Sequence, residues 1–228
     1  MPNYCAHVFF GEKVIKQLPD YVRASVAGSR EVFQSGLLGP DPVMFSPGCR
    51  WTASALHGKW QEDTSDVLGV MLQGENPQER SFAAGYLCHM MLDDVCHAKI
   101  KRWQREDGMS HLLLELGLDW MVLREQGENH FPNLEAANSG KVSQLAAKLI
   151  KPALPWQYRM GLLVMKQLYR PMKLAGPWYI AQIKETYRKP TQEMLGLLES
   201  TAVAAAKRLT MLCGGEQSKP EMAAAASF

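Results

Sequence analysis

The hydrophobic and polar positions of this chain follow a helical period. Apolar residues recur at intervals of three and four, and no segment shows the strict alternation of a half-buried strand. The pattern, with its breaks at Pro and Gly, predicts helices at residues 3–18, 20–27, 29–38, 51–60, 63–73, 77–105, 109–126, 141–151, 156–188 and 191–213. We therefore expect an all-α protein, a single-domain multi-helix bundle over residues 1–213, followed by a poorly ordered tail at 214–228.

Local signals mark the ends of several of these helices. Asn76-Pro-Gln-Glu79 combines an N-cap residue, a proline in the first turn and an acid three residues after the cap. Ser29 is a candidate N-cap for the helix that follows it. Residues 39–42, Gly-Pro-Asp-Pro, read as a stiff loop, and residues 43–50 as irregular. In the long tract 156–188, Pro171 and Pro177 are expected to bend the helix.

The helix predicted at 77–105 carries an unusual set of polar residues. His89, Asp93 and His97 recur every four residues, so they share one helix face, while their neighbours are mainly apolar. Burying imidazoles and a carboxylate costs several kcal/mol unless they are paired or bind a metal. We therefore expect this helix to be central and to carry metal ligands.

Other candidate ligands lie before and after this helix. His111 and Glu115 repeat the spacing of four on the next helix, and His7, Asp41 and His57 come from earlier segments. Singly, each could be a satisfied core or surface residue. Together they form a mixed imidazole and carboxylate set without cysteine, which fits zinc and, less selectively, manganese or iron. Eight ligands exceed the needs of one tetrahedral ion, so we expect two or three ions.

Composition excludes some classes of protein. The net charge of +2 is too small to imply binding of nucleic acid or of an anionic membrane, and no run of eighteen apolar residues suggests a membrane span. The five cysteines contain no C-x-x-C pair, and the first residues show no secretory signal. These observations predict a reduced, cytoplasmic protein, in which Cys88 and Cys96 are buried free thiols.

The order of the candidate ligands resembles the zinc-dependent phospholipase C superfamily, which includes the fungal single-strand-specific nucleases. The resemblance covers about residues 4–116 and is closest to small bacterial members. It rests on these segments: Ala6-His7-Val8, Leu37-Leu-Gly-Pro-Asp41-Pro42, Ala53-x3-His57, Ala84-Gly-Tyr-Leu-Cys-His89-x3-Asp93-Asp-x2-His97 and His111-x3-Glu115. Members are all-helical and hold three zinc ions that cleave phosphodiesters.

The resemblance implies a role for each ligand. One zinc would be held by Asp41, His57, His89 and Asp93. Asp93 would bridge to a second zinc held by His7, and the third would be held by His97, His111 and Glu115. The resemblance leaves the role of His97 as a zinc ligand open. In the secreted enzymes two more residues lie between the corresponding aspartate and histidine than lie between Asp93 and His97 here. Those enzymes also use an N-terminal Trp, for which the amine of Pro2, exposed by loss of Met1, is a candidate substitute.

The expected activity is that of a zinc-dependent phosphodiester hydrolase. Metal-bound hydroxide would be the nucleophile, and Asp41 could serve as a general base. Phospholipid is the favoured substrate, with single-stranded nucleic acid or a small phosphodiester as alternatives. The aromatic and basic tract 156–189 could contact a membrane surface, or be a core helix with a basic exposed side. A non-catalytic helical metal-binding or scaffold protein remains the competing class, and the oligomeric state is open.

Overall fold

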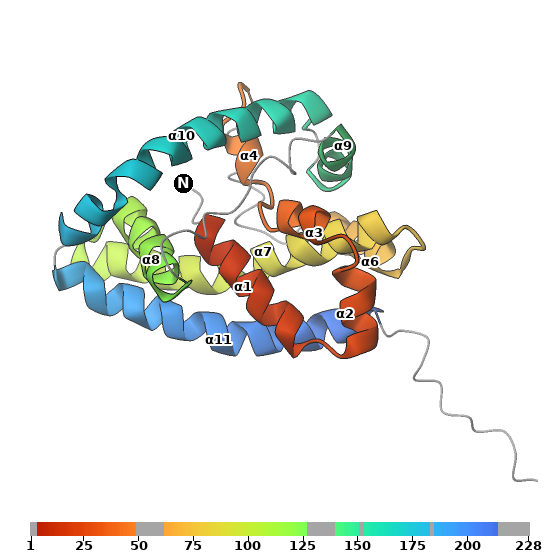
Figure 1. The fold of residues 1–228 in the computed structure, drawn as a ribbon, viewed down its shortest axis with the longest axis horizontal. Helices are drawn as coiled ribbons and strands as arrows, with labels where there is room; N and C mark the ends of the chain where they lie inside the picture. The colour runs from red at the N-terminus through yellow and green to blue at the C-terminus, as the bar shows by residue number, and fades with distance from the viewer. Residues whose placement is uncertain (1–3, 49–61, 127–139, 151–152, 183–184, 214–228) are drawn as a thin grey trace, which may run out of the picture.

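The computed structural model describes residues 4–48, 62–126, 140–150, 153–182 and 185–213. Within these ranges the chain forms ten α-helices and no strand, which confirms the all-α prediction (Figure 1). The helices are α1 (Tyr4–Gln17), α2 (Asp20–Val26), α3 (Arg30–Gly36), α4 (Asp41–Met44), α6 (Glu62–Gln73), α7 (Pro77–Asp107), α8 (His111–Gln126), α9 (Gly140–Leu149), α10 (Pro155–Gln182) and α11 (Glu185–Cys213). The helix predicted at 51–60, which contains His57, lies outside the described residues, as does the tail predicted at 214–228.

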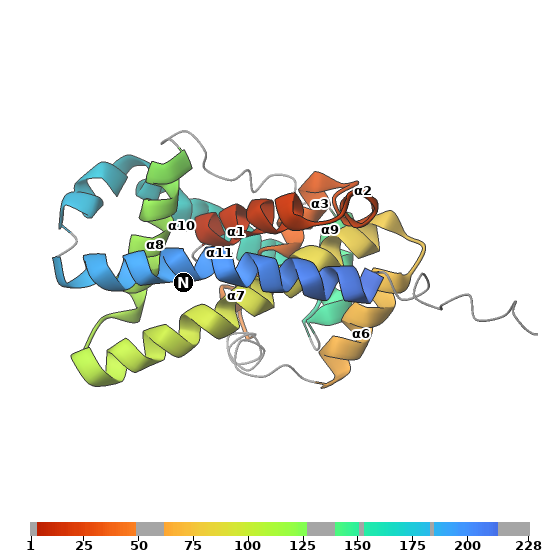
Figure 2. The same ribbon diagram turned by 90° about the horizontal axis from the view of Figure 1, so that it is seen from below.

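Helix α7 is the central element of the bundle. Every residue from Ser81 to Met90 is buried, so this part of the helix is enclosed on all sides. Figures 1 and 2 show α7 and α11 running side by side with α1 against them. The predicted start of α7 is confirmed, because the Asn76 side chain accepts hydrogen bonds from the backbone N–H groups of Gln78 and Glu79. The helix ends at Asp107, two residues later than predicted, where Gly108 adopts a left-handed conformation.

Three local predictions need correction. Residues 41–44 form the short helix α4 rather than a loop, because prolines fit the first positions of a helix, where an N–H group would have no partner. Helix α10 ends at Gln182 and α11 begins at Glu185, earlier than predicted, so Pro190 is inside α11. Ser29 occupies the N-cap position of α3, but its side chain makes no capping hydrogen bond. Pro171 and Pro177 fall within α10, which Figure 1 shows as an arch.

A pair of glycines sets the distance between α3 and α7. A Cβ atom on Gly36 would overlap the backbone carbonyl oxygen of Phe82, and one on Gly85 would overlap that of Phe33. The two backbones can therefore touch only because neither residue has a side chain. This close packing brings the end of α3 and the segment after it onto the histidine-bearing part of α7.

Most of the cysteines in the described part of the chain are buried; Cys213 is partly exposed. Cys88 and Cys96 are buried free thiols on α7, as predicted. Burial raises the pKa of the Cys96 thiol to about 12, so this sulfur is protonated and unreactive at neutral pH.

Across the described residues, none of the helices is both long enough and apolar enough to cross a membrane.

Candidate metal centre

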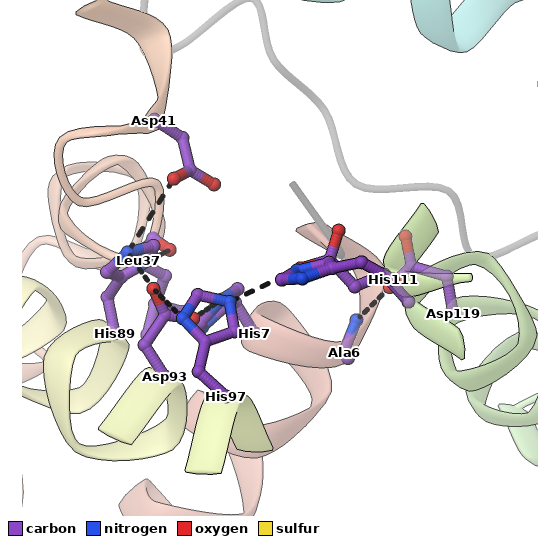
Figure 3. A network of polar contacts seen from close by, with 10 residues as sticks. Ala6, His7, Leu37, Asp41, His89, Asp93, His97, His111 and Asp119 are labelled. Carbon is purple, nitrogen blue, oxygen red and sulfur yellow. Dashed lines mark hydrogen bonds and ion pairs between the residues drawn. The ribbon is translucent and has the colours of Figure 1, made fainter. Parts of the chain in front are cut away.

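Two imidazoles from different helices converge on Asp93. His7, in the first turns of α1, places Nε2 3.2 Å from Asp93 Oδ1, and His89, one turn before Asp93 on α7, places Nε2 3.3 Å from Oδ2. The rings of His7 and His89 are stacked, with centroids 4.1 Å apart (Figure 3). All three side chains are buried. We call His7, His89 and Asp93 the inner cluster; their candidate ligand atoms lie within 4.8 Å of one another.

The orientation of His89 is set by the backbone that follows α3. Its Nδ1 lies 3.0 Å from the carbonyl oxygen of Leu37, and a carbonyl can only accept, so Nδ1 carries the proton. Gly39 packs against the opposite side of the ring at φ 52°, where a Cβ atom would overlap the imidazole. Nε2 of His89 is therefore held facing the carboxylate of Asp93, as the supporting hydrogen bond of a metal-binding histidine does.

Asp41 lies at the edge of the inner cluster. It is the first residue of α4 and is buried, with Oδ1 3.9 Å from His89 Nε2 (Figure 3). Helix α10 packs on this segment: the hydroxyl of Tyr158 donates to the carbonyl oxygen of Ser35, and Gly161 meets the carbonyl oxygen of Pro42. The structure thus places Asp41 beside His89, one of the residues with which the family resemblance grouped it.

A second group forms one turn further along α7. His97 Nε2 lies 3.3 Å and His111 Nε2 2.7 Å from the same oxygen, Oε1 of Glu115 on α8. We call these three residues the outer cluster; their candidate ligand atoms also lie within 4.8 Å of one another. His97 also links the two clusters, because its Nδ1 is 3.9 Å from Asp93 Oδ2. The shorter sequence spacing therefore does not remove His97 from the group with His111 and Glu115.

The electrostatics keep the acids ionised and His7 neutral. Burial raises the pKa of Asp93, but the nearby imidazoles of His89, His7 and His97 outweigh it and lower the pKa well below its usual range. Burial likewise raises the pKa of Glu115, while hydrogen bonds from His111 and His97 bring it down to about 2. Burial and the neighbouring His89 lower the pKa of His7. Neutral imidazoles and ionised carboxylates are the forms that bind a metal.

The inner cluster has the donor arrangement that a cation requires. When the His89 ring carries its one proton on Nδ1, the lone pair of Nε2 faces Oδ2 of Asp93, 3.3 Å away. Nε2 and Oδ2 are then both acceptors, so either a proton or a metal ion must lie between them. His7 is fully enclosed, and among the described residues its Nδ1 has no hydrogen-bond partner. Each cluster offers two imidazoles and one carboxylate, a set that fits zinc.

Two buried polar residues near the clusters escaped the sequence analysis. Asp119 lies one turn beyond Glu115, and its Oδ1 accepts a hydrogen bond from the backbone N–H of Ala6 at 2.8 Å, so α8 holds the start of α1 and with it His7 (Figure 3). Tyr86, one turn before His89, is fully buried, and its pKa is raised by burial and by the charges of Asp41 and Asp93. The sequence signal that could have identified them is helical spacing: Asp119 lies four residues after Glu115, and Tyr86 lies three residues before His89.

Comparison with known proteins identifies the family. A family model described as zinc dependent phospholipase C matches residues 6–188, which is most of the chain. Comparisons with curated proteins and with solved structures find no match. The matched range contains the inner and outer clusters, Asp41 and His57, and extends beyond the sequence motifs into α10 and the start of α11. The chain belongs to the zinc-dependent phospholipase C family.

Proposed function

We propose that this protein hydrolyses phosphodiesters with two or three zinc ions, and that its substrate is a phospholipid. Family membership and the two clusters support a zinc-dependent phosphodiesterase in general. The observation that carries the proposal is the position of Asp93, whose two carboxylate oxygens face imidazoles from two different helices. A carboxylate placed in this way suits a bridge between adjacent ions.

The proposed ligand sets follow the two clusters. His7 and Asp93 would hold one ion. His89, Asp93 and Asp41 would hold a second, with His57, outside the described residues, as its fourth ligand. The remaining ion would be held by the outer cluster. Two protein contacts serve this arrangement directly: the Leu37 carbonyl holds His89 in one tautomer, and Asp119 holds the first turn of α1.

The chemistry needs an activated water and a neutralised phosphate. Bound zinc would supply both, because it lowers the pKa of a bound water towards about 7 and offsets the negative charge of the diester. The proposed role of Asp41 is to take a proton from the attacking water. Oδ1 of this carboxylate faces His89, and the short helix α4 is held under α10, so the side chain is fixed in place. Oδ2 would accept the proton.

Zinc content and hydrolysis, measured together, test this proposal. Zinc is quantified by mass spectrometry on the purified chain, and hydrolysis of a soluble chromogenic phosphodiester is followed with and without added zinc. Asp93→Asn keeps the size of the side chain but removes its charge. We expect it to bind less zinc and to lose activity on the order of a thousandfold.

Asp94→Asn is the matched control. Asp94 is the next residue on the same helix but is exposed, so the variant should retain zinc and activity. Full activity in Asp93→Asn would contradict the proposed site. Zinc binding without hydrolysis in the wild type would favour the scaffold alternative, since ligands can be kept for stability alone.

A further inference from the structure

Helix α10 has apolar residues on both of its sides. Tyr158, Gly161, Leu162 and Met165 are buried against the rest of the protein. Five large apolar residues of the same helix are between 38% and 52% exposed: Trp156, Met160, Leu163, Val164 and Leu168. We call these five residues the outer stripe. At about 100° per residue they fall within one sector of roughly 140°. An exposed stripe of large apolar residues marks a surface that contacts a partner or a membrane.

The sequence segment that contains this helix is one-sided in charge. Between Glu135 and Glu185 the sequence contains eight Lys or Arg residues and no Asp or Glu. This stretch therefore carries a net charge of +8, whereas the rest of the chain carries −6. Arg159 is exposed beside the outer stripe on α10. Such segregation indicates attraction to an anionic surface that the small net charge of the whole chain conceals.

From these two observations we infer that the outer stripe of α10 is a docking surface for an anionic phospholipid membrane. Exposed Trp and Leu side chains enter the boundary between headgroups and acyl chains, while Lys and Arg contact the headgroups. A partner protein or a second copy could also cover an apolar stripe, but the absence of acidic residues over 49 positions of sequence favours a uniformly negative partner.

The docking surface is joined to the candidate site through α4. On the inner side of α10, Gly161 lies so close to the carbonyl oxygen of Pro42 that a Cβ atom would overlap it. Pro42 follows Asp41, and Tyr158 of α10 reaches the Ser35 carbonyl oxygen just before the loop that covers His89. A membrane bound to α10 would thus lie one helix away from Asp41 (Figure 1). This link to catalysis rests on the proposed function, whereas docking itself does not.

Vesicle sedimentation of the full chain tests the inference. The vesicles are either pure phosphatidylcholine or phosphatidylcholine mixed with phosphatidylglycerol. We expect binding to the mixed vesicles, weakened by added salt, and a loss of at least about tenfold in affinity in Trp156→Ser/Leu163→Ser. Val70→Ser, at a 72% exposed position on α6, is the matched control and should bind as the wild type does. Circular dichroism checks that all variants keep their helix content.

A second measurement uses the tryptophan itself. Brominated lipids should quench part of the fluorescence in the wild type, and Trp156→Phe should bind with little change but show less quenching. Unchanged vesicle binding in the double variant would overturn the inference. A wild-type dimer that dissociates in the double variant while vesicle binding stays the same would instead assign the stripe to self-association and also overturn it.

The same variants separate docking from catalysis. The double variant should hydrolyse a soluble phosphodiester at the wild-type rate but hydrolyse vesicle phospholipid more slowly. If the wild type binds vesicles through the stripe yet hydrolyses neither substrate, the proposed function fails and the docking surface stands. If both substrates are hydrolysed equally well by the wild type and the double variant, the docking surface is refuted and the proposed function stands.

Discussion

The inner and outer clusters share a donor set of two imidazoles and one carboxylate, but they are built differently. The inner cluster is buried and joins α1 to α7, so His7 and His89 are 82 positions apart in the sequence. The outer cluster joins the second half of α7 to the start of α8, within nineteen residues, and its histidines are 18% and 35% exposed. A site built from distant helices depends on the whole fold, whereas a site built across one connection depends mainly on two helix ends.

The difference extends to the supporting contacts. His89 is held by the Leu37 carbonyl and enclosed by Gly39, and the turn containing His7 is held by Asp119. The histidines of the outer cluster share one oxygen of Glu115 and reach solvent. We therefore expect an ion in the inner cluster to be tightly coupled to folding and an ion in the outer cluster to exchange more readily.

The variants His89→Ala and His111→Ala test the difference between the two clusters most directly. His89→Ala leaves a cavity and a buried carboxylate without its imidazole, so the free energy of unfolding of the zinc-free chain should fall by on the order of 3 kcal/mol. His111→Ala removes a half-exposed ring and should cost less than about 1 kcal/mol. Denaturant unfolding measures both, and zinc content should fall in each variant. Equal destabilisation would show that the clusters do not differ in their coupling to the fold.

Gly85→Ala should weaken the inner cluster without touching a ligand. The added Cβ atom would overlap the Phe33 carbonyl oxygen, so α3 and α7 must separate and the Leu37 carbonyl must move away from His89. We expect a loss of roughly 2 kcal/mol in unfolding free energy and weaker binding of one zinc. Gly196→Ala is the control, because open space surrounds this exposed glycine of α11 and alanine favours a helix. The prediction fails if Gly85→Ala is as stable as its control.

A further prediction concerns the pH dependence of stability. Burial raises the pKa of Asp119 to about 8, so between about pH 4 and pH 8 the folded chain keeps a proton that the unfolded chain has released. Stability of the zinc-free chain should therefore decrease as pH rises through this window, by no more than about 1.4 kcal/mol per pH unit from this group. Asp119→Asn cannot titrate and still offers an oxygen to Ala6, so its pH dependence should be shallower.

Unfolding curves recorded at several pH values across that window measure the slope. Asp66→Asn, at an exposed position on α6, is the control and should keep the wild-type slope. Identical slopes in wild type and Asp119→Asn would mean that Asp119 is already ionised in the folded chain. In that case its contact with Ala6 would be a charged one, stronger than a neutral hydrogen bond.

The secondary structure was predictable where the signal is local. Asn76 and Gly108 mark the limits of α7 through cap chemistry, and the apolar run inside it indicates burial. The prediction failed where prolines act by position: Pro42 lies within the short helix α4, and Pro190 lies inside α11. In α11, the hydroxyl of Thr191 donates to the carbonyl oxygens of Tyr187 and Arg188. The hydrophobic periodicity of the sequence does not predict this contact.

The sequence by itself determined the helical class and the chemistry of the site, because spacings of four place His89 with Asp93 and His111 with Glu115 on common helix faces. The family resemblance already placed His7 with Asp93, and the structure brings them together. Only the tertiary structure decided that the Leu37 carbonyl orients His89 and that Asp119 holds the start of α1. These contacts join residues far apart in the chain and depend on how closely the helices pack. Gly36 and Gly85 allow α3 and α7 to approach closely, but their presence in the sequence does not predict that approach. Helix periodicity is a local property, whereas the meeting of two helix faces is a property of the whole fold.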